Sequence, residues 1–508
     1  MRRVPLHSGS RLPVVALPDN ALLLTAPPPL DPLANVGAAV TEALRYPLAG
    51  PPLESLAQRA GTATIVVQPP ALPLPSPDDD PRRDALAAVL DALEQSGVPN
   101  ERQTLLVAGG LARRAGRREL EQLLRPDRAR GFRGDIAVHD CEDEALRPLE
   151  VDGRVHRIHP ALVETDLIVT IGAGETVLHG GATALLDACA AGTCRLAEAV
   201  SLLEPSVATG WRLAADLEAA LARSTPLIGV SLVLDRPHAT GLYRGYPWSE
   251  EARRSLARSP FRRLLNVSPA VLRRRALAGI GRELCVVTAL AGPPSVAHAE
   301  ALVRGAPIRG AVVPRQLDTI VVPLPWEGLH LPREPLNPIT AAALGLGHVL
   351  RLWRELPPLA PGGTVILLHP FSRVMGHGPQ APYRTLFAAL RDGTGRRLRS
   401  VEAAAARDRR ALAAYRNGKA PHPRLPFADW ESCRDVLVRA ERVIVAGCRD
   451  AGAARALGLV PSHNAATALE MAQGLAGGSG LTGVVLGPPY PVLSVDSADA
   501  ESTRNAGT

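Results

Sequence analysis

Short runs of apolar residues alternate with helical patterns along most of the chain. Each run has about the length of a strand, is rich in Val, Ile and Leu, and is bounded by Gly, Pro or charged residues. Such runs are typical of strands that are buried on both faces, and their alternation with helices predicts an α/β fold with largely parallel sheets. The runs are ATIVVQ, QTLLVAGG, DIAVHD, DLIVTIG, LIGVSLVL, LCVVTAL, DTIVVPLP, GGTVILLHP, RVIVAGC and GVVLGP.

The clearest helix signal is the stretch DDDPRRDALAAVLDALEQSG. Asp80 is placed to cap this helix, Pro81 suits its first turn, and Gly97 ends it. Apolar residues recur on one face, as packing against a sheet requires. They are Leu86, Val89, Leu90 and Leu93.

A second helix that starts with a proline suggests a domain boundary. It covers residues 268–279 and ends just before a new strand. We therefore expect two α/β domains, at 1–279 and 280–494, with a cleft between them. A long helix is predicted from 337 to about 356 in the second domain. The small, polar tail at 495–508 is expected to be disordered.

The composition is that of a globular chain. Of the 508 residues, 46% are hydrophobic and 21% are charged, and no apolar run approaches the roughly 18 residues of a membrane helix. The N-terminus lacks the continuous apolar stretch of a secretory signal. The six cysteines are scattered, without the spacing of zinc or iron–sulfur sites, which favours reduced thiols in the core. We expect a cytoplasmic protein that does not bind a membrane.

The net charge of +7 does not by itself indicate a nucleic-acid partner. Lys419 is the only lysine, so nearly every basic residue is an arginine, a bias that looks genome-wide. The densest basic stretch, residues 253–282, carries nine arginines but few aromatic residues to stack on bases. We expect a solvated or interdomain surface there, and no nucleic-acid partner. The oligomeric state has no signal in the sequence.

The glycine-rich stretch IGAGETVLHGGATALLDACA follows a predicted strand and opens a predicted helix. Gly172 and Gly174 begin a G-x-G pattern, but Val177 occupies the place of the third glycine of a dinucleotide-binding fingerprint. Two hypotheses remain for the HGGAT turn. Either it presents backbone N–H groups to an anion, or it is a tight turn that lets helix and strand pack closely.

Histidines at the carboxyl ends of strands are further candidate ligands. His179 adjoins the glycine turn, with Glu175 nearby, and His369 and His377 flank the loop after GTVILL. A lone histidine beside glycine is more often structural, and two histidines eight residues apart are not by themselves a metal motif. The histidines of RVHRIHP belong to an expected surface hairpin. The sequence contains no nucleophile elbow, P-loop or HExxH motif.

The order of local patterns is itself informative. An LPDNALLL hairpin leads to VTEALRYPLAGPPLESLA, a strand and a proline-rich loop, followed by LDALEQSGVPNERQTLLVAGG, IAVHD, TDLIVTIG and the GGA turn. The series continues through SLVLDR, LAPGGTVILL, ALGLVPSHNAATALEMA and GVVLGPPYPVL. Over nearly the whole chain, this order resembles the nickel-dependent lactate racemase family.

The resemblance implies two α/β domains with the active site in the cleft between them. In that family a pyridinium-based mononucleotide, tethered by a lysine, holds nickel in a sulfur–carbon–sulfur pincer. The cofactor takes a hydride from the α-carbon of a 2-hydroxy acid and returns it to either face. Two histidines alternate as general base and acid on the hydroxyl, a task that suits histidine near neutral pH, and a further histidine completes the nickel site.

The first two loops of the family lose polar groups in this chain. The family's D-D-x-T-R-P-x-P corresponds to QPPALPLP, which begins at Gln68 and keeps prolines but not the charged pair. The family's G-T-H-R corresponds to residues 110–113. Ala112 therefore replaces one acid/base histidine, while Arg113 is kept.

The glycine turn loses the residue that anchors the cofactor in the family. The family's E-P-H motif is matched only by Glu175 and by His179, which lies further along the sequence than the histidine of the motif. The family's G-G-A-K corresponds to residues 180–183, so Thr183 replaces the tethering lysine, and an amine could come from elsewhere only if the distant Lys419 reaches this site. No histidine occurs between His179 and His238 to match the family's nickel ligand.

These observations give the expected site in the loops after four predicted strands. By resemblance the cofactor would be a nickel-pincer nucleotide and the ligand a small molecule. The loops follow Val67, Ala108, Gly172 and Leu368. The catalytic candidates are His179, Glu175 and His377, the cofactor-binding candidates are Gly180, Gly181, Thr183, Gln68 and Arg113, and the metal candidate is His369.

Three functional hypotheses stay open. The first is a divergent family member that has lost racemisation at the nickel pincer and binds or converts a small hydroxy-acid-like ligand. The second is a 2-hydroxy-acid racemase or epimerase, an isomerase, with rearranged catalytic groups. The third is a non-catalytic ligand-binding or interaction protein on the same scaffold.

Overall fold

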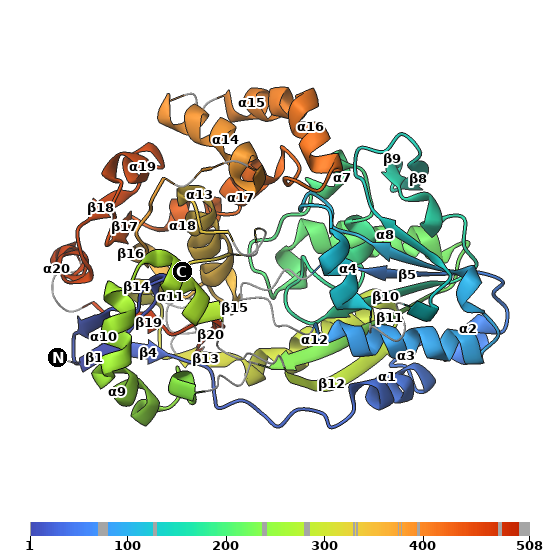
Figure 1. Cartoon of the computed structure of the whole chain (residues 1–508), viewed down its shortest axis with the longest axis horizontal. Helices are drawn as coiled ribbons and strands as arrows, with labels where there is room; N and C mark the ends of the chain where they lie inside the picture. Colours follow the sequence, from blue (N-terminus) through green and yellow to red (C-terminus); the bar gives the residue numbers. More distant parts are fainter. Residues whose placement is uncertain are drawn as a thin grey trace, which may run out of the picture.

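Two lobes, each built around one large sheet, make up the computed structural model of the chain (Figure 1). The sheets are largely parallel and carry helices, which confirms the predicted α/β fold. No helix in the described part of the chain is long and apolar enough to cross a membrane. The structure describes residues 2–69, 80–124, 130–235, 241–278, 285–328, 331, 334–373, 375–376, 378–393, 397–475 and 480–496.

The first lobe contains a six-stranded sheet. Its order is β12 (Cys285–Gly292), β11 (Leu227–Asp235), β10 (Ile168–Ala173), β5 (Ala63–Val67), β6 (Gln103–Val107) and β7 (Asp135–Val138). Neighbouring strands are parallel except β11 and β12. One face is covered by α1 (Val36–Arg45), α2 (Leu53–Ala57) and α3 (Arg82–Gln95), and the other by α6 (Thr183–Leu186), α8 (Thr209–Ala222) and α12 (Pro294–Ile308).

The second lobe contains a seven-stranded sheet whose paired strands are all parallel. Its order is β18 (Val460–Ser462), β17 (Arg442–Ala446), β16 (Leu359–Leu368), β14 (Leu317–Pro325), β19 (Thr482–Val485) and β4 (Leu22–Leu24), with β2 (Ser8–Gly9) beside β14. One face packs on α13 (Pro338–Ala342), α14 (Ala381–Arg391), α17 (Leu425–Glu431), α18 (Arg434–Arg439) and α19 (Ala451–Ala456). The other face packs on α20 (Ala465–Leu475) and the antiparallel pair β1 (Arg2–Pro5) and β3 (Val14–Leu17).

Smaller elements complete the two lobes. A three-stranded sheet joins β13 (Gly310–Val313), β20 (Val492–Val495) and β15 (Trp353–Arg354), and β8 (Arg147–Val151) pairs with β9 (Arg154–Ile158) in the expected hairpin. The remaining helices are α4 (Arg117–Leu123), α7 (Ala191–Cys194), α9 (Glu250–Arg258), α10 (Pro260–Val267), α11 (Ala270–Ala278), α15 (Leu398–Ala405) and α16 (Arg409–Arg416).

Most of the predicted elements are present. Every predicted apolar run contains a strand, and α3 covers the predicted helix after Asp80. The Asp80 carboxylate accepts a hydrogen bond from the Arg82 backbone N–H at 3.0 Å, as expected for a residue that begins a helix. The four apolar residues predicted on one face of α3 are all buried, and they pack against strands of the first sheet.

The sheets do not follow the expected division at residue 279. β12 lies after that position but completes the first sheet, whereas β2 and β4, near the N-terminus, belong to the second sheet. The expected LPDNALLL hairpin is wrong, because β3 and β4 pair with different strands instead of with each other. In the expected tail, Val495 ends β20, and residues 497–508 lie outside the described part of the chain.

The long helix predicted from 337 to about 356 is also wrong. α13 gives way to a π-helical turn at Ala343–His348 and a 3₁₀ turn at Val349–Arg351. The glycines of this segment allow unusually close packing, since a Cβ at Gly347 would lie 1.9 Å from the Ser432 hydroxyl oxygen. π-helical turns are frequent at functional sites, and this one forms part of the wall of the cavity between the lobes.

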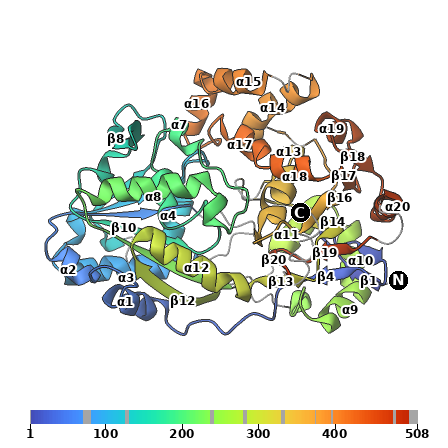
Figure 2. The ribbon, with the colours of Figure 1, turned by 180° about the vertical axis from the view of Figure 1, so that it is seen from behind.

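α16 connects the second lobe to the first. Figures 1 and 2 show it beside α7 of the first lobe, far from the second sheet. The buried Tyr415 hydroxyl donates to the Gly110 carbonyl and accepts from the Cys141 N–H, both at 3.2 Å. Its ring packs within the hydrophobic core behind the first sheet. We call residues 409–425 the strap.

Tyr415→Phe should weaken the folded state by about 1 to 3 kcal/mol, because a buried N–H and a buried carbonyl lose their partner while the ring stays in place. The midpoint of urea denaturation, followed by fluorescence, measures the loss. Tyr46→Phe is the matched control, since Tyr46 is 72% exposed. An unchanged midpoint for Tyr415→Phe would show that the strap does not stabilise the lobes.

Candidate functional site

A cavity of about 720 Å³ lies between the lobes. Loops that follow β5, β6 and β10 form one wall, as expected for the carboxyl ends of parallel strands. The π-helical turn and α17 of the second lobe also line it, together with the strap, which is hydrogen-bonded to the first lobe at Gly110 and Arg113. Residues that line it include Pro69, Arg113, Glu175, His179, Asp187, Gly347, His348, Arg351, Lys419 and Asp429.

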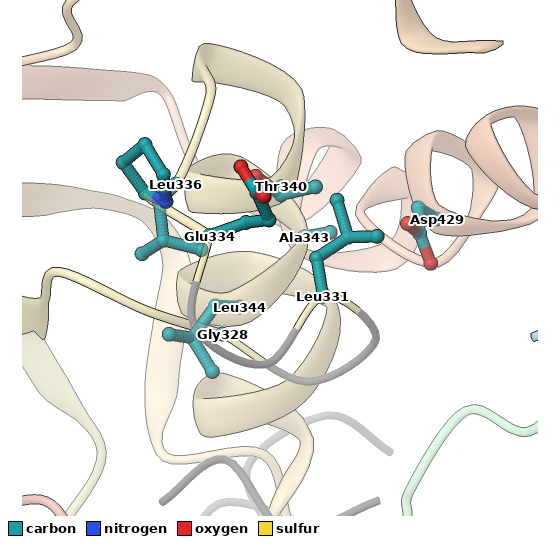
Figure 3. Close-up of a pocket in the computed structure, with 9 residues that line it drawn as sticks. Gly328, Leu331, Glu334, Leu336, Thr340, Ala343, Leu344 and Asp429 are labelled. Atoms are coloured by element: carbon teal, nitrogen blue, oxygen red, sulfur yellow. The ribbon is translucent and has the colours of Figure 1, made fainter. Parts of the chain in front are cut away.

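A much smaller pocket of about 10 Å³ adjoins this cavity on the side of the second lobe. Figure 3 shows that α13 and the turns after it carry Thr340, Ala343 and Leu344, while Asp429 comes from a neighbouring helix. Leu331, Glu334, Ala343 and Asp429 line both spaces. The Asp429 carboxylate accepts a 2.6 Å hydrogen bond from the Tyr383 hydroxyl. The small volume suits little more than one water molecule.

Polar groups of the glycine turn are already hydrogen-bonded to side chains of the protein. Gly180 and Gly181 have φ angles of 110° and 55°, which favour glycine. The Gly180 N–H donates to Gln68 Oε1 at 2.6 Å, and the Thr183 hydroxyl donates to the Gly180 carbonyl at 2.7 Å. Packing here is close, because a Cβ at Gly172 would lie 2.9 Å from the Gly180 Cα. Both hydrogen bonds and this packing support the tight-turn hypothesis for HGGAT.

His298, which no pattern in the sequence indicated, packs directly on this turn from α12. Its imidazole is fully buried and lies 3.2 Å from the Ser231 hydroxyl and 2.9 Å from the Thr176 carbonyl. It also stacks on Trp211, with ring centroids 5.7 Å apart. Burial lowers its pKa to about 4, although the hydrogen bond to Thr176 opposes this shift. The ring is therefore neutral near pH 7.

Gly181→Ala should destabilise the protein by about 2 to 4 kcal/mol, because it combines a left-handed backbone with overpacking. The new Cβ would lie 2.4 Å from the His298 Cβ. Thermal unfolding at pH 7 measures the loss. Gly192→Ala is the control, since no atom lies within 4 Å of its added Cβ. Equal losses in the two variants would contradict a tightly packed turn.

A buried polar network lies behind the glycine turn. The Gln68 side-chain amide donates to the Asp187 carboxylate at 2.6 Å. The Gln68 backbone carbonyl accepts from the Arg82 guanidinium at 2.9 Å. Arg82 forms a two-pronged pair with Asp80, at 2.9 and 2.6 Å. Paired charges and satisfied amides make such burial tolerable. The network holds the loop after β5 against the loop after β10.

Glu175 lines the cavity beside this network and is only 8% exposed. Burial raises the pKa of its carboxyl to about 7, against the opposing positive charges of Arg82 and Arg309, and the negative charge of Asp80 adds to the rise. The carboxyl makes no direct hydrogen bond to any residue that the structure describes. A carboxyl that titrates near neutral pH can both accept and release a proton there.

Glu175→Gln should become more stable than the wild type as the pH rises. The folded-state pKa is raised from 4.5 to about 7, so folding binds a proton in this interval and ionisation disfavours the folded state above it. The two proteins should match near pH 4, and the variant should gain up to about 3 kcal/mol by pH 8.

Chemical denaturation at pH 4, 6 and 8 measures this difference. Glu54→Gln, on the exposed surface of α2, is the control and should show no such trend. If Glu175→Gln and the wild type keep the same difference at all three values, the carboxyl does not titrate as described.

His179 and Arg113 also line the cavity. His179 Nε2 lies 3.1 Å from the Pro69 carbonyl, so that nitrogen carries the proton in the neutral tautomer that bonds there. The Arg113 guanidinium pairs with Glu119 and donates to the Gly418 carbonyl at 3.2 Å. Gln68, Gly180, Gly181 and Thr183 lie directly behind the wall, joined to it by the network above.

His369 is placed away from these residues. It is 3% exposed, its Nδ1 accepts from the Phe371 N–H at 3.1 Å, and it is not among the described residues that line the cavity. Burial lowers its pKa to about 3. No group of three or more His, Cys, Asp and Glu side chains suited to a metal ion occurs in the described ranges. His377, the other histidine expected in this loop, lies outside the described residues.

Comparisons with known proteins agree with this architecture. Residues 9–187 match the family model of the lactate racemase N-terminal domain. The lactate racemase apoprotein from Thermoanaerobacterium thermosaccharolyticum is similar in structure, with 16% sequence identity and a TM-score of 0.61 over 97% of this chain and 100% of that one. A protein from Thermotoga maritima matches at 13% identity and a TM-score of 0.45, over 92% of this chain and 100% of that one. No curated protein matches the sequence.

Two of these comparisons bear on the architecture, namely the family-model match and the likeness to the lactate racemase apoprotein. The sequence match covers the loops after β5, β6 and β10, and the structural match covers both lobes. Residues 9–187 are therefore similar to the N-terminal domain of lactate racemase, and the whole chain is similar in fold to the lactate racemase apoprotein.

Proposed function

We propose that this protein binds or converts a small hydroxy-acid-like ligand in the cavity between its lobes, and that its glycine turn has lost the nickel-pincer nucleotide of lactate racemases. The observation that carries the proposal is Thr183. It stands where the family tethers its cofactor with lysine, and its hydroxyl donates to the Gly180 carbonyl at 2.7 Å.

The surroundings of Thr183 support the same conclusion. Thr183 is 1% exposed, and its hydroxyl, which is already hydrogen-bonded, cannot replace an amine as a covalent anchor. The Gly180 N–H, which could otherwise receive an anion, is held by Gln68 at 2.6 Å. Ala112 lacks the imidazole of the family's acid/base residue. The residues at this turn therefore do not fit a lysine-tethered nickel cofactor, and we derive no reaction step through one.

The side chains of the cavity suit the binding of a hydroxy acid. A volume of about 720 Å³ lies in the range of small-molecule sites. Glu175, with its pKa raised to about 7, can accept the proton of a ligand hydroxyl and return it. His179 offers a second group for the same proton from the same loop. Proton exchange at a bound hydroxyl is the chemistry that these two residues can supply.

The protein should contain no stoichiometric nickel when it is produced with the enzymes that make the pincer cofactor, because the tether and the nickel ligands of the family are replaced. Elemental analysis and native mass spectrometry of the full chain measure nickel and any added mass. A lactate racemase produced in the same host is the positive control. About one nickel per chain with a matching added mass would contradict the proposed loss of the cofactor.

Ligand binding is tested on the same preparation. Calorimetric titration with D-lactate and L-lactate should show binding that weakens in Glu175→Gln and His179→Asn. Incubation with either enantiomer, followed by chiral chromatography, detects conversion. If neither enantiomer binds or is converted, the hydroxy-acid proposal fails and the non-catalytic interaction hypothesis takes its place.

A further inference from the structure

Lys419, the only lysine of the chain, lies in the wall of the cavity. It follows α16 within the strap and lines the same cavity as Glu175 and His179. The residue is exposed. Among the described residues, none forms a hydrogen bond or ion pair with its ammonium group.

The backbone around Lys419 is held in place from both lobes. Its own N–H donates to the Ala414 carbonyl at 2.9 Å, and Gly418 adopts a φ of 63° that closes the helix end. Arg113 of the first lobe donates to the Gly418 carbonyl at 3.2 Å. The buried hydroxyl of Tyr415 is fixed to Gly110 and Cys141. The start of the lysine side chain is therefore fixed relative to the first lobe.

Other cations of the cavity already have partners. Arg113 pairs with Glu119. The guanidinium of Arg351 is almost fully buried and donates to the carbonyls of Val200, Gly347 and Ser432, at 3.2 to 3.3 Å. Lys419 thus differs from both, because no described residue pairs with its ammonium group, although Lys419 lines the space that a ligand would fill.

We propose that Lys419 is the residue that binds the anionic group of the cavity's ligand, with its ammonium donating to a carboxylate or phosphate oxygen. This inference rests on the proposed ligand class, in which a 2-hydroxy acid supplies the carboxylate. Its hydroxyl is then available to Glu175 and His179, which line the same cavity. Lys419 is a positioning residue, since it holds the ligand while the proton exchange takes place elsewhere.

A single lysine permits a direct measurement. Reductive methylation of the full chain with ¹³C-formaldehyde keeps the positive charge and labels only Lys419 and the terminal amine. Addition of D-lactate or L-lactate should shift the Lys419 methyl resonance, with the same saturation as calorimetric binding. Inorganic phosphate is the second probe, because it tests the other source of the same anionic chemistry.

Substitutions give an independent readout. Lys419→Met should weaken lactate binding about tenfold or more, the usual effect of losing a charge-assisted hydrogen bond, whereas Lys419→Arg should keep most of the affinity. Arg258→Met, on the exposed surface of α9, is the control for a loss of positive charge remote from the cavity. Salt should weaken binding to the wild type more than to Lys419→Met.

The four outcomes separate this inference from the proposed function. A lactate-dependent shift together with weaker binding in Lys419→Met supports both. Binding of phosphate alone, with the same dependence on Lys419, supports the inference and overturns the hydroxy-acid proposal. Lactate binding that leaves the resonance and Lys419→Met unaffected overturns the inference alone. Absence of binding for both anions, with no shift, overturns both.

Discussion

The contact between His298 and the glycine turn determines the geometry of the site. A Cβ at Gly180 would lie 2.3 Å from the His298 ring, and one at Gly181 would lie 2.4 Å from its Cβ. Both positions must therefore be glycine, because a side chain at either one would clash with His298. Because the imidazole is neutral, it can donate from Nε2 to the Thr176 carbonyl while Nδ1 accepts from Ser231. The direction of the turn, and hence the placement of Glu175 and His179, follows from this packing.

The polar groups buried behind the glycine turn need hydrogen-bond partners, and other residues of the chain provide them. Gln68 joins the Gly180 N–H to Asp187, while Arg82 joins Gln68 to Asp80. Leaving any of these groups unsatisfied would destabilise the fold by about 1 to 3 kcal/mol or more. Glu175 differs from its neighbours, since its carboxyl has charges near it but no direct hydrogen bond to a described residue. The hydrogen-bonded residues of the network therefore have a structural role, whereas Glu175 is the candidate for proton transfer.

Local patterns in the sequence predicted the parts of the fold that depend on local chemistry. The strands were visible because strands buried on both faces must be continuously apolar, and α3 was visible because Asp80 and Pro81 begin a helix. The helix after Asn337 was mispredicted because its glycines pack against Ser432 and Leu367, which lie far away in the sequence. The pairing of β4 with β19 was missed for the same reason, since no local signal reports a distant partner.

The candidate site was only partly predictable. Glu175 and His179 were identified from a loop at a strand end and Arg113 from the family resemblance, and these three residues line the cavity. His298 was missed because it is a single polar residue among the buried, otherwise apolar positions of α12. The position of Lys419 was missed because it depends on how the strap packs on the first lobe. Local sequence patterns cannot show that residues 110 and 415, which are far apart in the sequence, are in contact.

The parallel pairing of β4 with β19 has a consequence for biosynthesis. Residues 22–24 leave the ribosome long before residues 482–485, their partners in the sheet. At about 5 to 20 residues per second, the first strand waits for roughly 25 to 90 s without its neighbour. The region that matches the family's N-terminal domain, residues 9–187, also ends before β11 and β12 of its own sheet are made. A nascent chain of that length exposes the edge of β10, and it needs either protection from other chains or the rapid arrival of the next strand.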